Sequence, residues 1–574
     1  MCSTSRSFSM SDHLASHLLL DQLQAEGTRF IFGSLASAES PVITATYEMR
    51  SDIHFLSALH DEVAGSMAIG YAQASGRPGV MAVLAAPGMA SVQTALYTSL
   101  KARVPLVVLV DQQDSQILSD EPPLAADLLE MAKPLAKWAC ELKTHAEIPR
   151  LIRRAFHEAN SPPKGPVVIS LPHNLLLKPS AGQAIVPPQI SPLGSADPAF
   201  LKKAAKALVS AQNPCIIFGN EVSQYRARKE AVSLVEVLGC AAFCEPMPTG
   251  VNFPNRHPQF CGVLPLDLTQ ANRLLSPFDV ILVLGMQTRI PAKVHEPPLI
   301  PQNASVIQIN VEPGLAGKTL PCHLAAVADI GETLSRIRAE IQMVSNNSWV
   351  DVTKRRAHNT IAWVSKRKQD LEEKLSYPGQ NAPISLLWLL RMIDAVRPQK
   401  SVIVSDLVND LCDPVQVLNL ESSSSFFSLN SGVQGYGLGA SLGIQWASPD
   451  HQVIALTSDL SAMVAPQALW TAAHYGLHAK YIVINNLGRS TYNLQLLSTP
   501  GSPLRVQLDN PPVSFRDLAT SMRVPAGQIS MMSELEPALQ HMFETQGPFL
   551  LDVHVSDGHM EQQALDKEIA ASNS

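Results

Sequence analysis

Short apolar runs alternate with amphipathic segments along most of the chain. The runs "RFIFG", "GVMAVLAAPG", "VPLVVLVDQQ" and "GPVVISLP" have the length and β-branched content of buried strands in a parallel sheet. A stretch rich in Pro, Ser and Gly, "LPHNLLLKPSAGQAIVPPQISPLGSADP", has no periodicity and reads as a linker. The pattern therefore predicts a first α/β domain over residues 10–180.

The same alternation occurs twice more. A helix, "AFLKKAAKALVSA", and the strands "PCIIFG", "DVILVLG" and "ASVIQIN" predict a second α/β domain over residues 196–345. The charged segment "TKRRAHNTIAWVSKRKQDLEEKL" predicts a solvated helical connector. The strands "SVIVSD" and "PFLLDVHV" frame a third domain over residues 380–560. The predicted fold class is thus α/β, with three doubly wound parallel sheets.

The composition restricts the partners. A net charge of −7 over 574 residues, without a concentrated basic stripe, argues against a nucleic-acid partner. The chain has no run of 18 apolar residues, so we expect no membrane span. Its eight cysteines are scattered and form no C-x-x-C pair. They are typical of reduced thiols, and we expect a cytoplasmic protein.

The candidate chemistry begins at "VIALTSDLSAMVAPQALWTAAHYGLHAKYIVINNLG". One apolar run ends at Asp459 and the next ends at Asn486, so both side chains belong to the carboxyl edge of a parallel sheet, where ligands collect. A carboxylate, an amide oxygen, the backbone carbonyl of Gly488 and a diphosphate would together satisfy Mg²⁺. The alternative is a helix N-cap at Asp459 and an ordinary turn at "NNLG".

This stretch resembles the diphosphate and magnesium motif of thiamine-diphosphate enzymes, which usually begins Gly-Asp-Gly and ends Asn-Asn. Ser458 and Leu460 stand at the two glycine positions, and Ser461 follows, a form similar to the thiamine enzymes of menaquinone synthesis. "GYAQASGRPGVMAVLAAPGMASVQTALYTSLKARVPLVVLVDQQ" is similar to benzoylformate decarboxylases and, more broadly, to the acetolactate synthase and pyruvate decarboxylase superfamily. The resemblance covers nearly the whole chain.

The resemblance implies a pyrimidine-binding domain, a middle domain and a diphosphate-binding domain, with thiamine diphosphate and Mg²⁺ as cofactors. In this superfamily the cofactor lies between the first domain of one subunit and the third of another, which implies a homodimer at minimum and a homotetramer commonly. No residue pattern points to the FAD that some acetolactate synthases hold, and we expect none.

The implied activity is that of a lyase or carboligase. Such an enzyme decarboxylates a 2-oxo acid such as pyruvate and passes the acyl unit to a proton or to a second aldehyde or ketone. One alternative is a lyase that acts on a 2-hydroxy ketone or an acyl-thioester. Another is a degenerate member that serves as a regulatory or scaffolding subunit.

The activating carboxylate departs from the superfamily pattern. Relatives carry a glutamate nine residues before the Gly of "GYA", where it binds the aminopyrimidine and activates the cofactor. The same count leads here to Asp61, with Glu62 beside it. Asp61 serves with an adjusted backbone, Glu62 takes over through a local slip, or activation is crippled. Read without the resemblance, "HDE" indicates only a charged helix start.

Further positions follow from the resemblance, with plain loop or packing roles as the alternative. They are Ser37 over the substrate carboxylate, Gln112 at the rim of the active site, Asn409 at the diphosphate, Gly432 at the 4′-amino group, and Gln434 in place of an apolar wedge under the cofactor. Leu84 stands where benzoylformate decarboxylases carry a histidine, and no histidine matches their second one, although His295 lies a few residues away. These losses argue for carboligation over plain benzoylformate decarboxylation.

Overall fold

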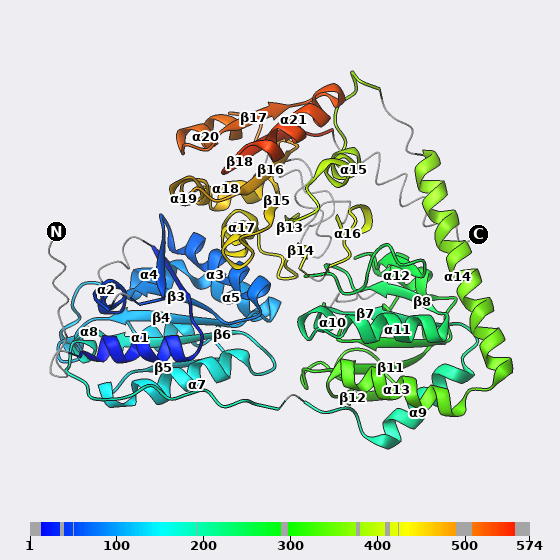
Figure 1. The fold of residues 1–574 in the computed structure, drawn as a ribbon, viewed down its shortest axis with the longest axis horizontal. Coiled ribbons are helices and arrows are strands. Elements are labelled where there is room, and N and C mark those ends of the chain that lie inside the picture. The colour runs from blue at the N-terminus through cyan, green and yellow to red at the C-terminus, as the bar shows by residue number, and fades with distance from the viewer. Residues whose placement is uncertain are drawn as a thin grey trace.

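The computed structural model describes residues 13–34, 40–49, 51–191, 193–288, 297–374, 379–407, 414–422, 424–488 and 508–556. These residues form three six-stranded sheets, and every strand pair within them is parallel (Figure 1). Each sheet lies inside one of the three predicted residue ranges, whose boundaries stay a prediction. The predicted fold class, α/β with three parallel sheets, is confirmed.

The first sheet has the strand order β2-β1-β3-β4-β6-β5. Its strands are β1 (Phe30–Ser34), β2 (His54–Ala58), β3 (Gly79–Leu84), β4 (Leu106–Gln112), β5 (Trp138–Glu141) and β6 (Pro166–Pro172). One face packs against α1 (Ala15–Ala25), α2 (Pro41–Glu48) and α7 (Ile148–Asn160), and the other against α3 (Asp61–Ser75), α4 (Ala85–Ser91) and α5 (Gln93–Ala102). The short helices α6 (Leu128–Ala132) and α8 (His173–Leu176) complete the domain.

The middle sheet has the order β12-β11-β10-β7-β8-β9. Its strands are β7 (Pro214–Phe218), β8 (Ala241–Cys244), β9 (Phe260–Val263), β10 (Val280–Leu284), β11 (Ser305–Asn310) and β12 (Leu324–Val327). Its helices are α9 (Pro198–Ser210), α10 (Asn220–Gln224), α11 (Arg228–Leu238), α12 (Leu268–Leu275) and α13 (Ile330–Val344). The charged segment forms the long helix α14 (Asn347–Lys374) along the outer side of this domain, as predicted (Figure 1).

The third sheet has the order β14-β13-β15-β16-β18-β17. Its strands are β13 (Ser401–Asp406), β14 (Phe426–Phe427), β15 (Gln452–Ser458), β16 (Ala479–Asn485), β17 (Ala526–Ile529) and β18 (Phe549–His554). One face packs against α17 (Tyr436–Ala447), α18 (Asp459–Val464), α19 (Ala468–Tyr475) and α20 (Phe515–Ser521), and the other against α15 (Leu386–Val396), α16 (Pro414–Val417) and α21 (Met532–Glu544). The apolar runs around Asp459 and Asn486 are β15 and β16.

Helices α3 and α17 join the first and third domains, side by side at the centre of the molecule (Figure 1). They approach so closely that a Cβ on Gly443 would lie 1.8 Å from the Met67 carbonyl oxygen, and a Cβ on Gly70 would lie 2.3 Å from that of Ala440. Only glycine fits at these two crossings. The contact fixes the start of α3 relative to the loop that precedes α17.

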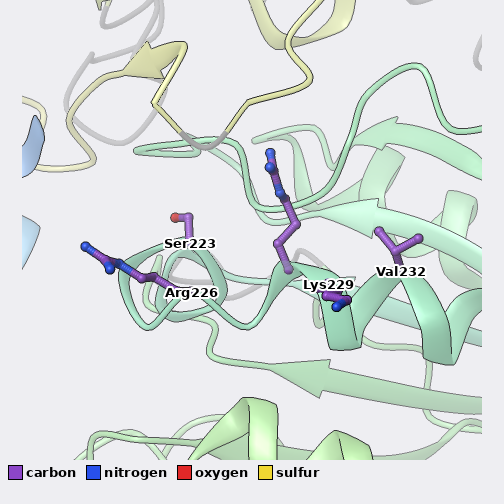
Figure 2. Close-up of a pocket in the computed structure, with 5 residues that line it drawn as sticks. Ser223, Arg226, Lys229 and Val232 are labelled. Carbon is purple, nitrogen blue, oxygen red and sulfur yellow. The ribbon is translucent and has the colours of Figure 1, made fainter. Parts of the chain in front are cut away.

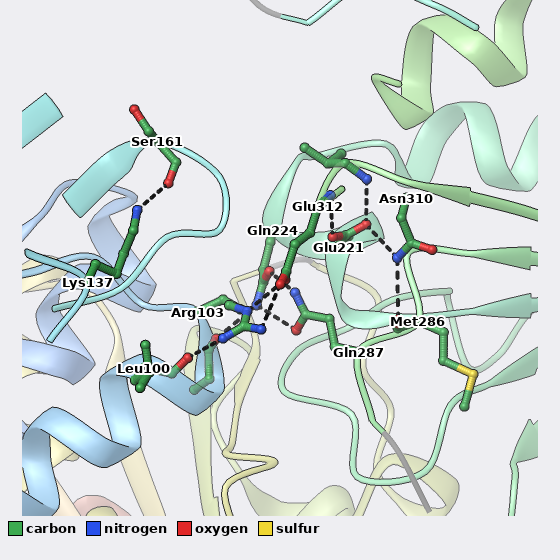
Figure 3. Close-up of polar contacts among 12 residues, drawn as sticks. Leu100, Arg103, Lys137, Ser161, Glu221, Gln224, Met286, Gln287, Asn310 and Glu312 are labelled. Carbon is green, nitrogen blue, oxygen red and sulfur yellow. Dashed lines mark hydrogen bonds and ion pairs between the residues drawn. The ribbon is translucent and has the colours of Figure 1, made fainter. Parts of the chain in front are cut away.

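An ion pair joins the first and middle domains. Arg103, directly after α5, donates from Nε and Nη2 to the two carboxylate oxygens of Glu312 at 2.7 and 2.8 Å (Figure 3). Glu312 is nearly buried, and the backbone N–H of the same residue donates to the carboxylate of Glu221 at 3.0 Å. This bidentate geometry holds the two domains in one orientation.

Candidate cofactor site

Asp459 is the centre of a hydrogen-bonded turn at the carboxyl edge of the third sheet. Its Oδ2 accepts from the backbone N–H of Gly488 at 2.7 Å and of Asn486 at 3.2 Å, and its Oδ1 accepts from Leu460 N–H at 2.7 Å. The structure thus brings Asp459, Asn486 and Gly488 together, as the sequence predicts. The Gly488 N–H faces Asp459; a metal contact through its carbonyl stays a prediction.

The two residues that replace motif glycines fit this geometry without strain. Ser458 is extended and its Oγ accepts from Ser461 N–H at 3.2 Å, so Ser458, and not Asp459, is the N-cap of α18. Leu460 lies in α18 and supplies one of the backbone donors to Asp459. The alternative interpretation of Asp459 as a plain N-cap is therefore wrong.

The negative charge at this edge has few counter-charges. Burial raises the pKa of Asp459, the three backbone N–H bonds lower it, and the buried carboxylate of Asp552 raises it further. No lysine or arginine in the described part of the chain pairs with either carboxylate; only His554 lies near Asp552, at 3.6 Å. A buried charge needs a partner, so a cation fits here.

The described residues contain no group of three His, Cys, Asp or Glu side chains that could hold a metal unaided. Amide, backbone and diphosphate oxygens would supply the other ligands.

A second buried aspartate shapes the loop before α17. Asp406, at the end of β13, accepts from the backbone N–H of Gly435 at 3.1 Å and of Gly437 at 3.0 Å. Within this loop Gly432 is exposed with φ +73°, and Gln434 is partly buried. The sequence analysis missed Asp406, although Asp406 is the last residue of its strand and Asp459 directly follows the end of β15.

At the edge of the first sheet, Asp61 and Glu62 begin α3. Burial raises the pKa of Asp61 and the facing Ser34 hydroxyl lowers it, but the pair does not meet hydrogen-bond geometry. Asp61 Oδ1 is consequently buried without a hydrogen-bond partner among the described residues. Burial alone raises the pKa of Glu62 to about 7. The structure thus provides two carboxylates with elevated pKa values at adjacent positions.

Asp111 is a further acid at this edge that the sequence analysis missed. It pairs in register with Leu84 on β3, and its Oδ1 accepts from Ser40 Oγ at 2.9 Å. Burial raises the pKa of Asp111 to about 7, and the Ser40 bond opposes this rise. The adjacent Gln112 donates from Nε2 to the Ala126 carbonyl at 3.2 Å. The sequence signal for Asp111 was an acidic residue at the end of the apolar run "VPLVVLV".

The predicted residues Ser37 and Asn409, and the neighbouring candidate His295, lie outside the described residues. Asp61 and Glu62 lie at the start of α3 in the first domain, whereas Asp459 and its turn lie in the third domain.

A pocket of about 280 Å³ opens beside α10 and α11, with Ser223, Arg226, Arg228, Lys229 and Val232 in its lining. Arg226 and Lys229 extend in different directions and do not converge on one point (Figure 2). The pocket shares no residue with either sheet edge and is not part of the candidate site.

Among the described helices, none combines the length and apolar character of a membrane span.

Comparison with known protein families identifies the family of this chain. Residues 14–131 match the N-terminal TPP binding domain of thiamine pyrophosphate enzymes, residues 201–337 match the central domain, and residues 415–553 match the C-terminal TPP binding domain. The chain belongs to the thiamine pyrophosphate enzymes. Asp61 falls in the first of these matches, and Asp459 and Asn486 fall in the third.

Similar thiamine pyrophosphate enzymes cover nearly the whole chain. A benzoylformate decarboxylase of Pseudomonas aeruginosa is 29% identical, over 94% of this chain and 98% of its own. A probable acetolactate synthase large subunit of Methanococcus aeolicus is 27% identical, over 93% and 90%. Among solved structures, a 4-hydroxybenzoylformate decarboxylase of Rhodococcus jostii matches with a TM-score of 0.79 and 27% identity, over 95% of this chain and 99% of its own.

Proposed function

We propose that this protein is a thiamine-diphosphate- and Mg²⁺-dependent lyase or carboligase that acts on a 2-oxo acid such as pyruvate. The observation that carries the proposal is the buried Asp459 carboxylate, which the backbone of Asn486 and Gly488 holds at the edge of the third sheet. The family match over all three domains and the two groups of relatives support the same reaction kind.

In this proposal the Asp459 carboxylate, the Asn486 amide and the Gly488 carbonyl would hold the metal, and the diphosphate would supply further oxygen ligands. Ser458, Leu460 and Ser461 form the surrounding turn, with Asn409 at the diphosphate. The neutral backbone donors around Asp459 oppose the rise in its pKa that burial causes. A free carboxylate is the form that binds a divalent cation.

Two elements of the chain would position the organic part of the cofactor. Asp61 Oδ1, buried and unpaired, would accept a hydrogen bond from the aminopyrimidine ring. Gly432 and Gln434 lie on the loop that Asp406 orders. When bound, thiamine diphosphate acts as the electron sink for cleavage or formation of the bond next to the carbonyl. Ser37 and Gln112 would contact the 2-oxo acid and its aldehyde or ketone acceptor.

The superfamily resemblance, in which the cofactor lies between the first domain of one subunit and the third domain of another, supports an oligomer. We propose a homodimer at minimum and a homotetramer as the working form. Five of the described cysteines, Cys140, Cys215, Cys240, Cys261 and Cys322, are free thiols, which supports the proposal of a reducing compartment such as the cytoplasm.

Calorimetric titration of cofactor-stripped protein with thiamine diphosphate, with and without Mg²⁺, tests the proposal. We expect saturable binding that requires Mg²⁺, followed by release of carbon dioxide from a 2-oxo acid such as pyruvate and condensation when an aldehyde is present. Binding without decarboxylation would favour the lyase acting on a 2-hydroxy ketone or an acyl-thioester. No binding at millimolar cofactor would refute the proposal and favour a scaffolding role.

A further inference from the structure

A buried carboxylate outside the predicted metal ligands lies beside the proposed metal site. Asp552 is on β18, next to β16 in the sheet, and it is fully buried. Its Oδ1 accepts from Asn485 Nδ2 at 3.0 Å, whereas its Oδ2 has no hydrogen-bond partner among the described residues. His554 Nε2 lies 3.6 Å from Oδ2, and Asp552 raises the pKa of His554. An ionised carboxylate in this position is costly unless positive charge lies nearby.

Asp552 is connected to the metal-binding turn through Asn485. Asn485 donates to Asp552 through Nδ2 and accepts the Leu487 backbone N–H through Oδ1 at 3.1 Å. Leu487 has φ +61°, an uncommon conformation for a leucine. The bond to Asn485 holds this conformation, which in turn directs the N–H groups of Asn486 and Gly488 toward Asp459.

The arrangement has a cost without a cation. Asp552 lies near enough to Asp459 to raise the pKa of Asp459 by like-charge repulsion. A chain that needed only to hold Asn485 in place could use a neutral acceptor. The second negative charge is useful where a divalent cation is to be attracted.

From these contacts we propose that Asp552 is a positioning residue of the metal site, which orients the 486–488 turn through Asn485 and adds negative charge behind Asp459. This inference rests on the proposed function. Outer residues of this kind typically change metal affinity by about 10- to 100-fold. They do so without contact with the metal or substrate.

The test compares Asp552→Asn with wild type in two measurements. Asparagine keeps an oxygen for Asn485 but removes the charge. We therefore expect Mg²⁺-dependent binding of thiamine diphosphate to weaken by about 10-fold or more in calorimetry, and the thermal unfolding temperature of the cofactor-free protein to stay equal or rise. Glu245→Gln is the matched control, because Glu245 is a fully buried carboxylate of the middle domain with backbone N–H partners, and it should leave Mg²⁺ dependence unchanged.

The outcomes separate the possibilities. Metal-dependent binding within about twofold of wild type, or equal destabilisation of the cofactor-free and loaded protein, would overturn the role of Asp552. If Asp552→Asn does not fold, Asn485→Ser interrupts the same connection and should weaken Mg²⁺-dependent binding; unchanged binding would overturn the inference. Wild-type protein without any Mg²⁺ dependence would refute the proposed function itself, and the inference with it.

Discussion

Replacing Gly443 by alanine tests whether the contact between α3 and α17 sets the geometry of the site. The added Cβ would lie 1.8 Å from the Met67 carbonyl oxygen, 2.7 Å from its carbonyl carbon and 2.8 Å from Tyr71 N. All three atoms belong to the backbone of α3, so no side chain can rotate out of the way. Ordinary contact begins near 3.4 Å, so the two helices must separate by about 1.6 Å if they move along this line.

The magnitude follows from two opposing terms. An extra methyl group in a well-packed core typically lowers the free energy of unfolding by about 1 to 3 kcal/mol. We take the upper end of this range, because only backbone atoms of α3 could move away from the new Cβ. Alanine in place of glycine in a helix interior returns about 1 kcal/mol. The net loss is about 2 kcal/mol, which lowers the unfolding temperature of a domain of this size by about 4 to 8 °C.

The same displacement should weaken the cofactor site, since α3 begins at Asp61 and α17 follows the loop with Gly432. Misplacement of about 1 Å can cost about 100-fold in rate. Differential scanning calorimetry and thiamine diphosphate titration measure the two effects. Gly331→Ala on α13 is the control, because its Cβ would meet Asp329 Oδ1 at an ordinary 3.5 Å. A Gly443→Ala protein with the stability and cofactor affinity of wild type would refute the close contact.

Three further changes test the edge of the first sheet. Asp61→Asn should lower the rate of carbon dioxide release by about 100-fold or more, whereas Glu62→Gln should change it by less than about threefold; the reverse order would assign activation to Glu62. Asp111→Asn should flatten the pH dependence of stability in urea unfolding. Burial raises the pKa of Asp111 to about 7 in the folded protein, whereas an unfolded chain has an aspartate pKa of about 4. Between these two pH values the folded state binds more protons than the unfolded state. The free energy of unfolding of the wild type therefore falls as the pH rises from about 4 to about 7. Equal slopes for Asp111→Asn and wild type would contradict the assignment.

The strands were predictable from sequence because parallel strands buried on both faces are continuous apolar runs. "VIALTS" and "YIVINN" correspond to β15 and β16, and the polar residues after them meet at one edge, as predicted. The glycine crossings of α3 and α17 were not predictable, because Gly70 and Gly443 are ordinary helix residues until the two helices are packed. Such contacts depend on tertiary structure alone.

The acids missed at the site had a signal in the sequence. Asp406, Asp111 and Asp552 each interrupt or end an apolar run, which is the feature that identified Asp459. What the sequence could not supply was their partners. Ser40 reaches Asp111 from a different βα connection, and Asn485 reaches Asp552 from the neighbouring strand β16. A polar residue in a buried strand predicts a buried network, and the sheet order decides which members meet.

Three positions that depart from the superfamily pattern, Ser458, Leu460 and Asp61, each have a structural role at the candidate site. Leu460 supplies a backbone N–H to Asp459 from helical geometry that any residue adopts, and Ser458 adds a cap that glycine would lack. Asp61 keeps a carboxylate oxygen that is buried and unpaired. An unpaired buried oxygen lowers the stability of the cofactor-free protein unless a bound ligand contacts it. Its retention at Asp61 therefore supports the proposed cofactor-binding role over a purely scaffolding role.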